Sequence, residues 1–460
     1  MQSRINMFIN KKGTMNNSKN FYKSLVALVI PIAIQNLITS AVNSADVFML
    51  GFVGQAELSA VSLANQVQFL LSGLFFGINS GIVMLCSQYW GKKDTDTIQK
   101  VMGIAFKAAL LFCILFALGA FLLPETIMKI YTNDIELITI GVGYLKIISI
   151  SYILLAASQV YLSVLRSVER AHVSTIISSV ALITNVVLNA VFIFGLFGAP
   201  KLGVIGVAVA TTIARIVEVI LCVWDLYHNK VFTFNIKFVF DWDKLLFLDY
   251  IKYSIPALLN DISWTFAFST YSIIMGHLNA DVVAANSVVS TVRNLCSVLC
   301  FGIAAGGTVL IGKAIGENRL EDAKKDADRL VKASVISGII TGVVLLLVKP
   351  IVFECFILSE RAYEYLNFML LINSYYIVGQ VFNTVTIAGI FRAGGDSKFG
   401  MICDTITMWC VAVPLGFIAA FVLKLPPMAV YFILCLDEFW KIPVVIKHYK
   451  SYKWLKNITR

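Results

Sequence analysis

Charged residues are scarce in this chain of 460 residues, of which Asp, Glu, Lys and Arg make up only 14%. A soluble domain is roughly a quarter charged, so the composition argues against a soluble fold. Hydrophobic residues make up 58%, and the mean hydropathy is +0.82. The sequence therefore predicts a protein that crosses a membrane several times. Its net charge of +10 is typical of basic cytoplasmic loops, and we expect no nucleic-acid partner.

Metal-binding patterns are missing as well. Only four His occur, far apart in the sequence, and the nine Cys show no CxxC or Cys/His ligand spacing. Most of the cysteines lie in apolar runs, where they act as small hydrophobic residues. No nucleophile, His and metal ligands cluster at membrane depth. We therefore expect neither an enzyme nor a cofactor.

Twelve apolar segments are long enough to span a bilayer. The first six run at 24–50, 58–90, 99–123, 137–165, 172–198 and 203–227, and the second six at 249–277, 283–312, 330–354, 364–391, 397–423 and 427–446. The predicted parts are a cytoplasmic tail at 1–21, an N-terminal lobe at 22–228, an interfacial linker at 229–247, a C-terminal lobe at 248–447 and a basic cytoplasmic tail at 448–460.

The Lys and Arg residues predict the orientation. If both termini are cytoplasmic, the inner loops and tails, with 441–460 counted among them, hold most of these residues, and only five fall in outer loops. This asymmetry supports the twelve-helix count and cytoplasmic termini. Residues 1–21 are polar and basic, without the apolar core and cleavage site of a secretory signal, so we interpret them as a mobile tail. These features suit a bacterial-type plasma membrane.

The two halves of the chain repeat one another. At one constant offset, Ile30-Pro31 matches Ile255-Pro256, and Phe76-Gly77-Ile78 matches Phe301-Gly302-Ile303. One position beyond that offset, Arg166 matches Arg392. Each half has six segments, so the two halves enter the membrane in the same sense, as parallel repeats of a transporter do. The predicted fold is an all-α integral membrane protein with twelve transmembrane helices in two six-helix pseudo-symmetric lobes.

Asp46 is a carboxylate inside the first apolar segment, where burial of a charge marks a candidate functional site. Its counterpart in the second half is Tyr271, so the repeat itself does not require an acid there. Asn185 and Asn189 of the fifth segment stand four apart and share one helix face. A carboxylate facing two amides suits a proton or a small cation. The alternative is a hydrogen-bonded clamp between helices.

Other charged residues lie within the segments. Asp261 follows Pro256 by five residues and is a second candidate for ion coupling, or alternatively faces a helix end or loop. Arg215 and Glu218 are three apart and suit an intrahelical ion pair. Arg293 of the eighth segment lines a central cavity or pairs with Asp261.

The chain resembles the multidrug and toxic compound extrusion (MATE) transporters. The resemblance rests on the two six-helix halves and on three motifs: Pro31 and Asp46 with fourteen residues between them and then Gly51-x-x-Gly54, the inner loop Arg392-Ala-Gly-Gly-Asp396, and Lys453-Trp454-Leu455. It implies an efflux antiporter that exports organic cationic or amphipathic compounds against inward Na⁺ or H⁺. In some members an Asp of the first helix joins an Asn and an Asp of the fifth in an ion site.

Asp46 and Asn185 match that ion site, and Thr211 of the sixth segment is a further match. Asn189 stands where those members have Asp, which removes one charge. The first-half loop also departs, reading Arg166-Ser-Val-Glu-Arg170 where Ala-x-Gly-Asp is the family pattern. The resemblance implies Na⁺ or H⁺ at Asp46, and helices that bend at the hinges Pro31 and Pro256 during alternating access.

A substrate cavity of apolar, aromatic, amide and Met side chains is expected between the halves. The alternative role for each candidate is helix packing. The candidates are Gln35, Asn65, Gln66, Gln68, Phe69, Tyr271, Met275 and Arg293.

Two other classes of membrane protein compete with a drug exporter. A lipid-linked oligosaccharide flippase shares the two-lobed design but often carries more basic residues in its central cavity than Arg293 and Arg215. A receptor or scaffold does not account for asymmetric buried acids. The expected partners of an efflux transporter are a small organic substrate and membrane lipid, and the expected state is a monomer.

Overall fold

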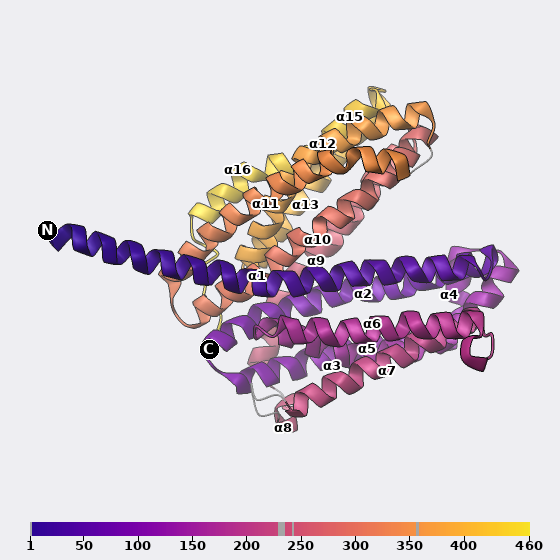
Figure 1. Cartoon of the computed structure of the whole chain (residues 1–460), viewed down its shortest axis with the longest axis horizontal. Helices are drawn as coiled ribbons and strands as arrows, with labels where there is room; N and C mark the ends of the chain where they lie inside the picture. Colours follow the sequence, from indigo (N-terminus) through magenta and orange to yellow (C-terminus); the bar gives the residue numbers. More distant parts are fainter. Residues whose placement is uncertain (1, 229–234, 242, 356–357) are drawn as a thin grey trace. The chain divides into compact units, whose positions relative to one another are not determined.

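The computed structural model describes residues 2–228, 235–241, 243–355 and 358–460, and these contain helices and no strand. In the first half the helices are α1 (Gln2–Gly51), α2 (Gln55–Gly91), α3 (Thr95–Leu122), α4 (Pro124–Tyr131), α5 (Ile135–Ser167), α6 (Ala171–Phe194), the short 3₁₀ helix η1 (Leu196–Gly198), α7 (Val204–His228) and α8 (Ile236–Phe240) (Figure 1). Positions 229–234 and 242 of the expected linker lie outside the described residues.

The second half contains α9 (Lys244–Gly276), α10 (Ala280–Gly316), α11 (Leu320–Cys355), α12 (Glu360–Thr384), α13 (Ser397–Thr405), α14 (Val413–Phe417), α15 (Pro427–Leu434) and α16 (Asp437–Lys450). Three π-helical stretches join some of these into longer helices: η2 (Val385–Phe391), η3 (Ile406–Ala412) and η4 (Ile418–Val422).

Within the described part of the chain, 10 helices are long and apolar enough to cross a membrane. The two other expected segments coincide with α9 and with the pair α15–α16. Helix α9 is long, but Asp249, Lys252 and Asp261 reduce its hydropathy. The expected mobile tail at 1–21 differs, because residues 2–21 form the first turns of α1.

The internal repeat is visible in the helix bounds. Helices α1 and α9 end at Gly51 and Gly276, and α2 and α10 end at Gly91 and Gly316, so both pairs of ends keep the offset found in the sequence. The turns that follow α2 and α10 place Lys93 and Asn318, which also match at this offset, at φ 61°. The repeat seen in the sequence is therefore a repeat of local structure.

Packing divides the chain into two compact units. The N-terminal unit is Ile34–Asp261, and the C-terminal unit is the chain up to Ala33 together with Ile262–Arg460. Helices α1 and α9 each pass from one unit into the other, shortly after their prolines Pro31 and Pro256. The domain boundaries expected from the sequence remain predictions.

Glycines bring helices close together in each unit. In the C-terminal unit, Gly338 and Gly342 of α11 face α12: a Cβ on Gly338 would lie 3.0 Å from Cα of Val378, and one on Gly342 would overlap the backbone oxygen of Ser374. Glycines four apart with this role form the G-x-x-x-G packing motif of membrane helices. The motif fixes α11 against α12.

The C-terminal segment explains one of the sequence motifs. Trp454 is fully buried in the core of the C-terminal unit, and its indole donates to the backbone oxygen of Tyr449 over 3.0 Å. Its own backbone oxygen lies where a Cβ on Gly394 would be. Gly394, the first glycine of Arg392-Ala-Gly-Gly-Asp396, is thus the position at which the chain around Trp454 crosses the turn before α13.

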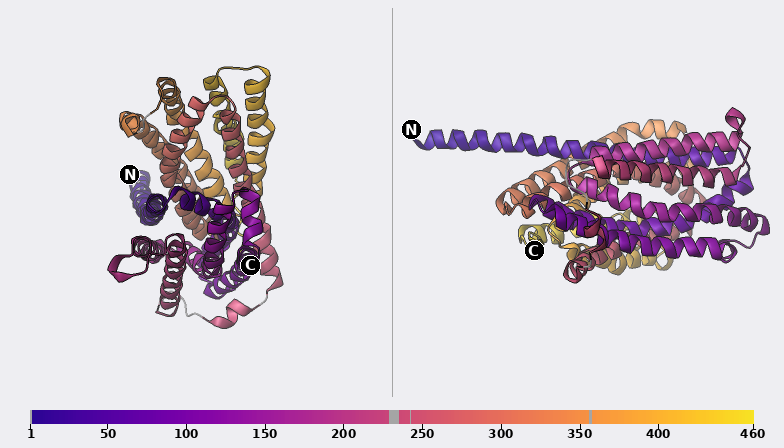
Figure 2. Two further views of the ribbon diagram at one scale, coloured as in Figure 1. Left: turned by 90° about the vertical axis from the view of Figure 1, so that its right-hand side faces the viewer. Right: turned by 90° about the horizontal axis from the view of Figure 1, so that it is seen from below.

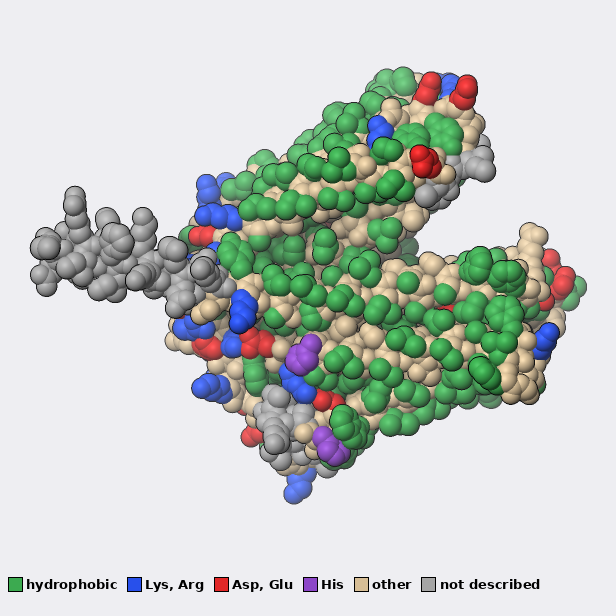
Figure 3. All heavy atoms as spheres, in the orientation of Figure 1, with side chains coloured by type: hydrophobic (Ala, Val, Ile, Leu, Met, Phe, Trp, Pro, Cys, Tyr) green, Lys and Arg blue, Asp and Glu red, His purple; other side chains and the backbone are tan. Residues whose placement is uncertain are grey.

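The surface has the pattern of a membrane protein. On the face shown in Figure 3, hydrophobic side chains cover the helices along their length, and charged side chains gather near the helix ends. Large hydrophobic side chains on α3, such as Leu111, Leu115 and Leu118, are half exposed or more. Figure 2 shows from two further sides how the helices run along one another within each unit.

Candidate functional site

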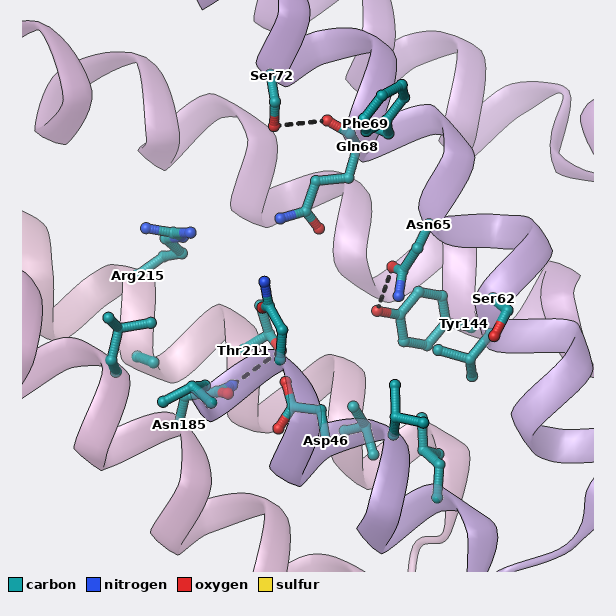
Figure 4. A pocket seen from close by; sticks show the side chains of 18 of the residues that line it. Asp46, Ser62, Asn65, Gln68, Phe69, Ser72, Tyr144, Asn185, Thr211 and Arg215 are labelled. Carbon is teal, nitrogen blue, oxygen red and sulfur yellow. Dashed lines mark hydrogen bonds between the residues drawn. The ribbon is translucent and has the colours of Figure 1, made fainter. Parts of the chain in front are cut away.

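A cavity of about 340 Å³ lies inside the N-terminal unit, between the transmembrane helices α1, α2, α5, α6 and α7. Helix α1 contributes Asp46, α5 contributes Tyr144, α6 contributes Asn185, α7 contributes Thr211 and Arg215, and α2 contributes a longer set (Figure 4). The α2 set is Leu58, Val61, Ser62, Asn65, Gln68, Phe69 and Ser72. The size suits a small organic ligand.

Four of the five residues expected to couple an ion form one hydrogen-bonded chain, and three of the four, Asp46, Asn185 and Thr211, line this cavity. Asn189 Nδ2 donates to Asp46 Oδ1 over 2.7 Å and to Asn185 Oδ1 over 3.3 Å. Asn185 Nδ2 donates to Thr211 Oγ1 over 3.0 Å. Asn185 and Asn189 project from the same face of α6 because they stand one helical turn apart. The structure brings all four side chains together.

The oxygens of this chain of residues are available to a cation or a proton. Asn189 is fully buried, and its Oδ1 has no hydrogen-bond partner among the described residues. Asp46 is half buried and lines the cavity. Carboxylate, amide and hydroxyl oxygens are ligands of hard cations. In the described chain no three His, Cys, Asp or Glu side chains group as a metal site.

Three of the expected substrate-contacting residues line the same cavity, namely Asn65, Gln68 and Phe69. Asn65 Oδ1 accepts a 3.0 Å hydrogen bond from the Tyr144 hydroxyl, which fixes its position. Two others lie elsewhere: Gln35 donates to Ser178 Oγ over 3.0 Å, and Gln66 is exposed on α2 and is not part of the lining.

The remaining candidates lie outside this cavity. Tyr271, Met275 and Arg293 of the C-terminal unit line a much smaller cavity, of about 20 Å³, which is room for one water molecule. The Arg293 guanidinium stacks over the ring of Phe268, 4.7 Å from its centre. Asp261 is half buried and is the last residue of the N-terminal unit, and its role in ion coupling remains a prediction.

A buried ionic cluster in the C-terminal unit was missed by sequence reasoning. Lys441 Nζ lies 3.0 Å from Asp404 Oδ1 and 3.2 Å from Glu438 Oε1, and Asp437 accepts a hydrogen bond from the Tyr271 hydroxyl over 3.3 Å. The three α16 residues are at most 2% exposed. Counting Lys441 with the inner loops and tails was wrong, because its ammonium group pairs inside the bundle. The i, i+3 spacing of Glu438 and Lys441 was the available signal.

Arg215 and Glu218 form the intrahelical ion pair that their spacing predicts. Arg215 Nη1 lies 2.7 Å from Glu218 Oε2, and the carboxylate is 2% exposed while the guanidinium is 22% exposed. Arg215 therefore stands between a buried acid and the cavity.

A model of the MatE family matches residues 31–191 and 256–418, one stretch in each half. The chain is similar to "Uncharacterized transporter YisQ" of Bacillus subtilis (strain 168), with 22% identity over 94% of this chain and 95% of the relative. It is 24% identical to "Probable multidrug resistance protein NorM" of Rhizobium meliloti (strain 1021), over 89% and 88% of the two chains. It is also 24% identical to "Multidrug and toxin extrusion protein 1" of Oryctolagus cuniculus, over 88% and 70%.

Solved structures share the fold. A crystal structure of "MATE in the bent conformation" matches with a TM-score of 0.85 and 18% identity, over 96% of this chain and 97% of that one. Such structures contain twelve transmembrane helices in two lobes, which confirms the fold class expected from the sequence. The three relatives are transporters or drug-resistance proteins by name, and none of them supports the flippase alternative.

Proposed function

The chain belongs to the MATE family of multidrug efflux transporters, and from this premise we propose that it is an antiporter. It exports organic cationic or amphipathic compounds in exchange for inward Na⁺ or H⁺, by alternating access. It acts as a monomer in the plasma membrane, with both termini cytoplasmic and lipid along its apolar faces. The orientation rests on the concentration of Lys and Arg in the inner loops.

One observation carries this proposal: Asp46, joined to Asn189 by a 2.7 Å hydrogen bond, faces a 340 Å³ cavity in the N-terminal unit. A membrane-embedded carboxylate is costly when ionised. The site contains one carboxylate, because position 189 is Asn and not Asp. A single proton or Na⁺ therefore neutralises its charge. The neighbouring amide and hydroxyl oxygens supply further ligands if the ion is Na⁺.

Ion binding changes the cavity through α1. Pro31 removes one backbone hydrogen bond from α1, so this helix bends at a lower cost than its neighbours. Neutral Asp46 and charged Asp46 favour different bends, and the organic compound binds one of them better. Ion and compound then drive each other across the membrane because they prefer opposite states.

The test is dye efflux from cells or everted vesicles under separate Na⁺ and H⁺ gradients. We expect Asp46→Asn to abolish ion-driven efflux at normal expression, since a neutral amide neither takes up a proton nor carries a negative charge that attracts Na⁺. Glu57→Gln is the matched control, because it removes a carboxylate of α2 outside the cavity lining. Asp261→Asn tests the second candidate acid. Wild-type activity in Asp46→Asn contradicts coupling at this site, and loss only in Asp261→Asn moves the coupling to that residue.

A further inference from the structure

A groove of about 170 Å³ lies between α3 and α7 in the N-terminal unit, and it shares no lining residue with the cavity at Asp46. Helices α3 and α7 each pack closely against α5 but scarcely touch one another. Helix α5 therefore forms the floor of the groove, where the small side chain of Ala157 leaves room. Val223 on its α7 side is 45% exposed, so the groove opens to the surroundings of the helices.

The lining of the groove is apolar. It consists of stripes with helical spacing: positions 102 and 106 of α3, positions 157, 160 and 161 of α5, and positions 219, 222, 223 and 226 of α7. The hydroxyl of Tyr161 is the one oxygen among these side chains, and it donates to Asp225 Oδ2 over 2.6 Å. The same carboxylate accepts two hydrogen bonds from Arg170. The polar end of Tyr161 is thus engaged within the protein.

This chemistry distinguishes between possible occupants. A bound water needs two to four polar partners, and a charged compound needs a counter-charge or hydrogen bonds, which the lining does not supply. A helix of a second copy is about 10–12 Å across, and two turns of it fill several times the volume of this groove. A hydrocarbon chain needs only apolar surface, and lipid chains surround every spanning helix.

The groove lies near the ends of its helices, where lipid headgroups are expected. Positions 219–226 cover about 10 Å of α7 and end two residues before the helix does. Trp224 and Tyr227, which alternate with lining residues there, are largely exposed, and exposed Trp and Tyr mark the membrane interface. On α3, Lys107 follows a lining residue and directs its ammonium group to backbone oxygens at the end of α8. The groove therefore extends from the interface into the hydrocarbon.

We propose that this groove binds one acyl chain of a membrane phospholipid, with the headgroup at the level of Trp224 and Tyr227. In the orientation proposed above, the lipid belongs to the cytoplasmic leaflet. A chain in the groove packs against three helices, whereas a chain on an exposed helix face packs against one. Because packing decides association inside a bilayer, this lipid exchanges more slowly than its neighbours. The site goes beyond the export function and stands or falls without it.

The first test locates the lipid on wild-type protein. The protein is placed in nanodiscs of phosphatidylethanolamine that include a phosphatidylethanolamine with a photoactivatable diazirine in one acyl chain, and labelled peptides are identified by mass spectrometry after irradiation. We expect residues 102–106, 157–161 and 219–226 to be labelled about three- to tenfold more than the exposed face of α3 at Leu111, Leu115 and Leu118. Equal labelling of the groove and this face overturns the proposal, and the measurement needs no variant to fold.

The second test fills the groove. Val219→Phe places a ring in the space for the chain, and Ile220→Phe makes the same kind of change at a neighbouring position that is 59% exposed and outside the lining. Native mass spectrometry counts the phospholipids that each purified protein retains. We expect Val219→Phe to lower the fraction with one bound phospholipid about tenfold and Ile220→Phe to change it less than about twofold. Equal retention by the two variants, or retention of detergent alone by wild type, overturns the proposal.

Discussion

Replacing Gly342 by alanine is expected to destabilise the protein, although it adds a single methyl group to a membrane helix. The new Cβ would overlap the backbone oxygen of Ser374 and lie 3.2 Å from that residue's carbonyl carbon. The overlap is with main chain, so no side-chain rotation relieves it. Helices α11 and α12 must separate, and Gly338, whose own Cβ position is 3.0 Å from Cα of Val378, lies on the same contact line.

The size of the effect follows from this geometry. Extra methyl groups in a packed core cost about 1–3 kcal/mol, and a gap of roughly 0.5–1 Å removes a quarter to a half of the dispersion energy of the facing atoms. The matched control is Gly119→Ala on α3, where a Cβ meets nothing within 4 Å. At this position alanine should raise the free energy of unfolding by about 0.5–1 kcal/mol, because alanine favours the helical conformation more than glycine does.

The assay is unfolding of the purified protein in mixed micelles by increasing SDS, followed by helical circular dichroism. Gly342→Ala should lower the unfolding free energy by about 1–3 kcal/mol, and Gly119→Ala should leave it equal or higher. If Gly342→Ala unfolds with the same free energy as the wild type, and the control Gly119→Ala is folded, the close approach of α11 and α12 at this residue is refuted.

Three further predictions use the same unfolding or efflux measurements. Lys441→Met should cost about 3–5 kcal/mol because Asp404 and Glu438 lose their buried counter-charge, whereas exposed Lys447→Met should change stability by less than about 0.5 kcal/mol; equal effects of the two would contradict a buried pair. Gly394→Ala should displace Trp454 and lower the unfolding midpoint in SDS, and an unchanged midpoint would mean that the last segment can move without loss. Asn189→Ala should raise the ion concentration needed for half-maximal efflux, because Asp46 loses its donor and a neighbouring amide oxygen; a wild-type ion dependence would exclude Asn189 from the site.

Much of the fold could be predicted because hydropathy and the internal repeat are properties of the sequence itself. A run of apolar residues identifies a spanning helix wherever it packs, and helical periodicity alone places Asn185 and Asn189 on one face. Their meeting with Asp46 is a contact between α1 and α6; it was a hypothesis from the cost of burying these polar groups, and the resemblance to a family supported it. The sequence pattern of each helix separately does not determine it.

Contacts between helices could be predicted less well from the sequence. Lys441 near the end of an apolar segment has the same local sequence signature as a loop lysine, and only the approach of Asp404 from α13 distinguishes the two. Likewise, the polar side chains of Gln66 and Gln68 are equally suited to a cavity. Their positions on α2 relative to the other helices place one outside the lining and the other in it.

The π-helical stretch η2 accounts for a difference in length between the two halves. Helix α5 begins at Ile135 and its counterpart α12 begins at Glu360, at the same offset that separates the ends of α1 and α9. The turns after α5 and after η2, with Glu169 and Gly395 at φ 61° and 76°, match only one position beyond that offset. Between these points the second half is therefore one residue longer than the first, and η2 lies in that interval, where the wider π turn accommodates the additional residue. The π turn thus allows the turns after α5 and η2 to keep the same local structure although the two helical stretches differ in length by one residue.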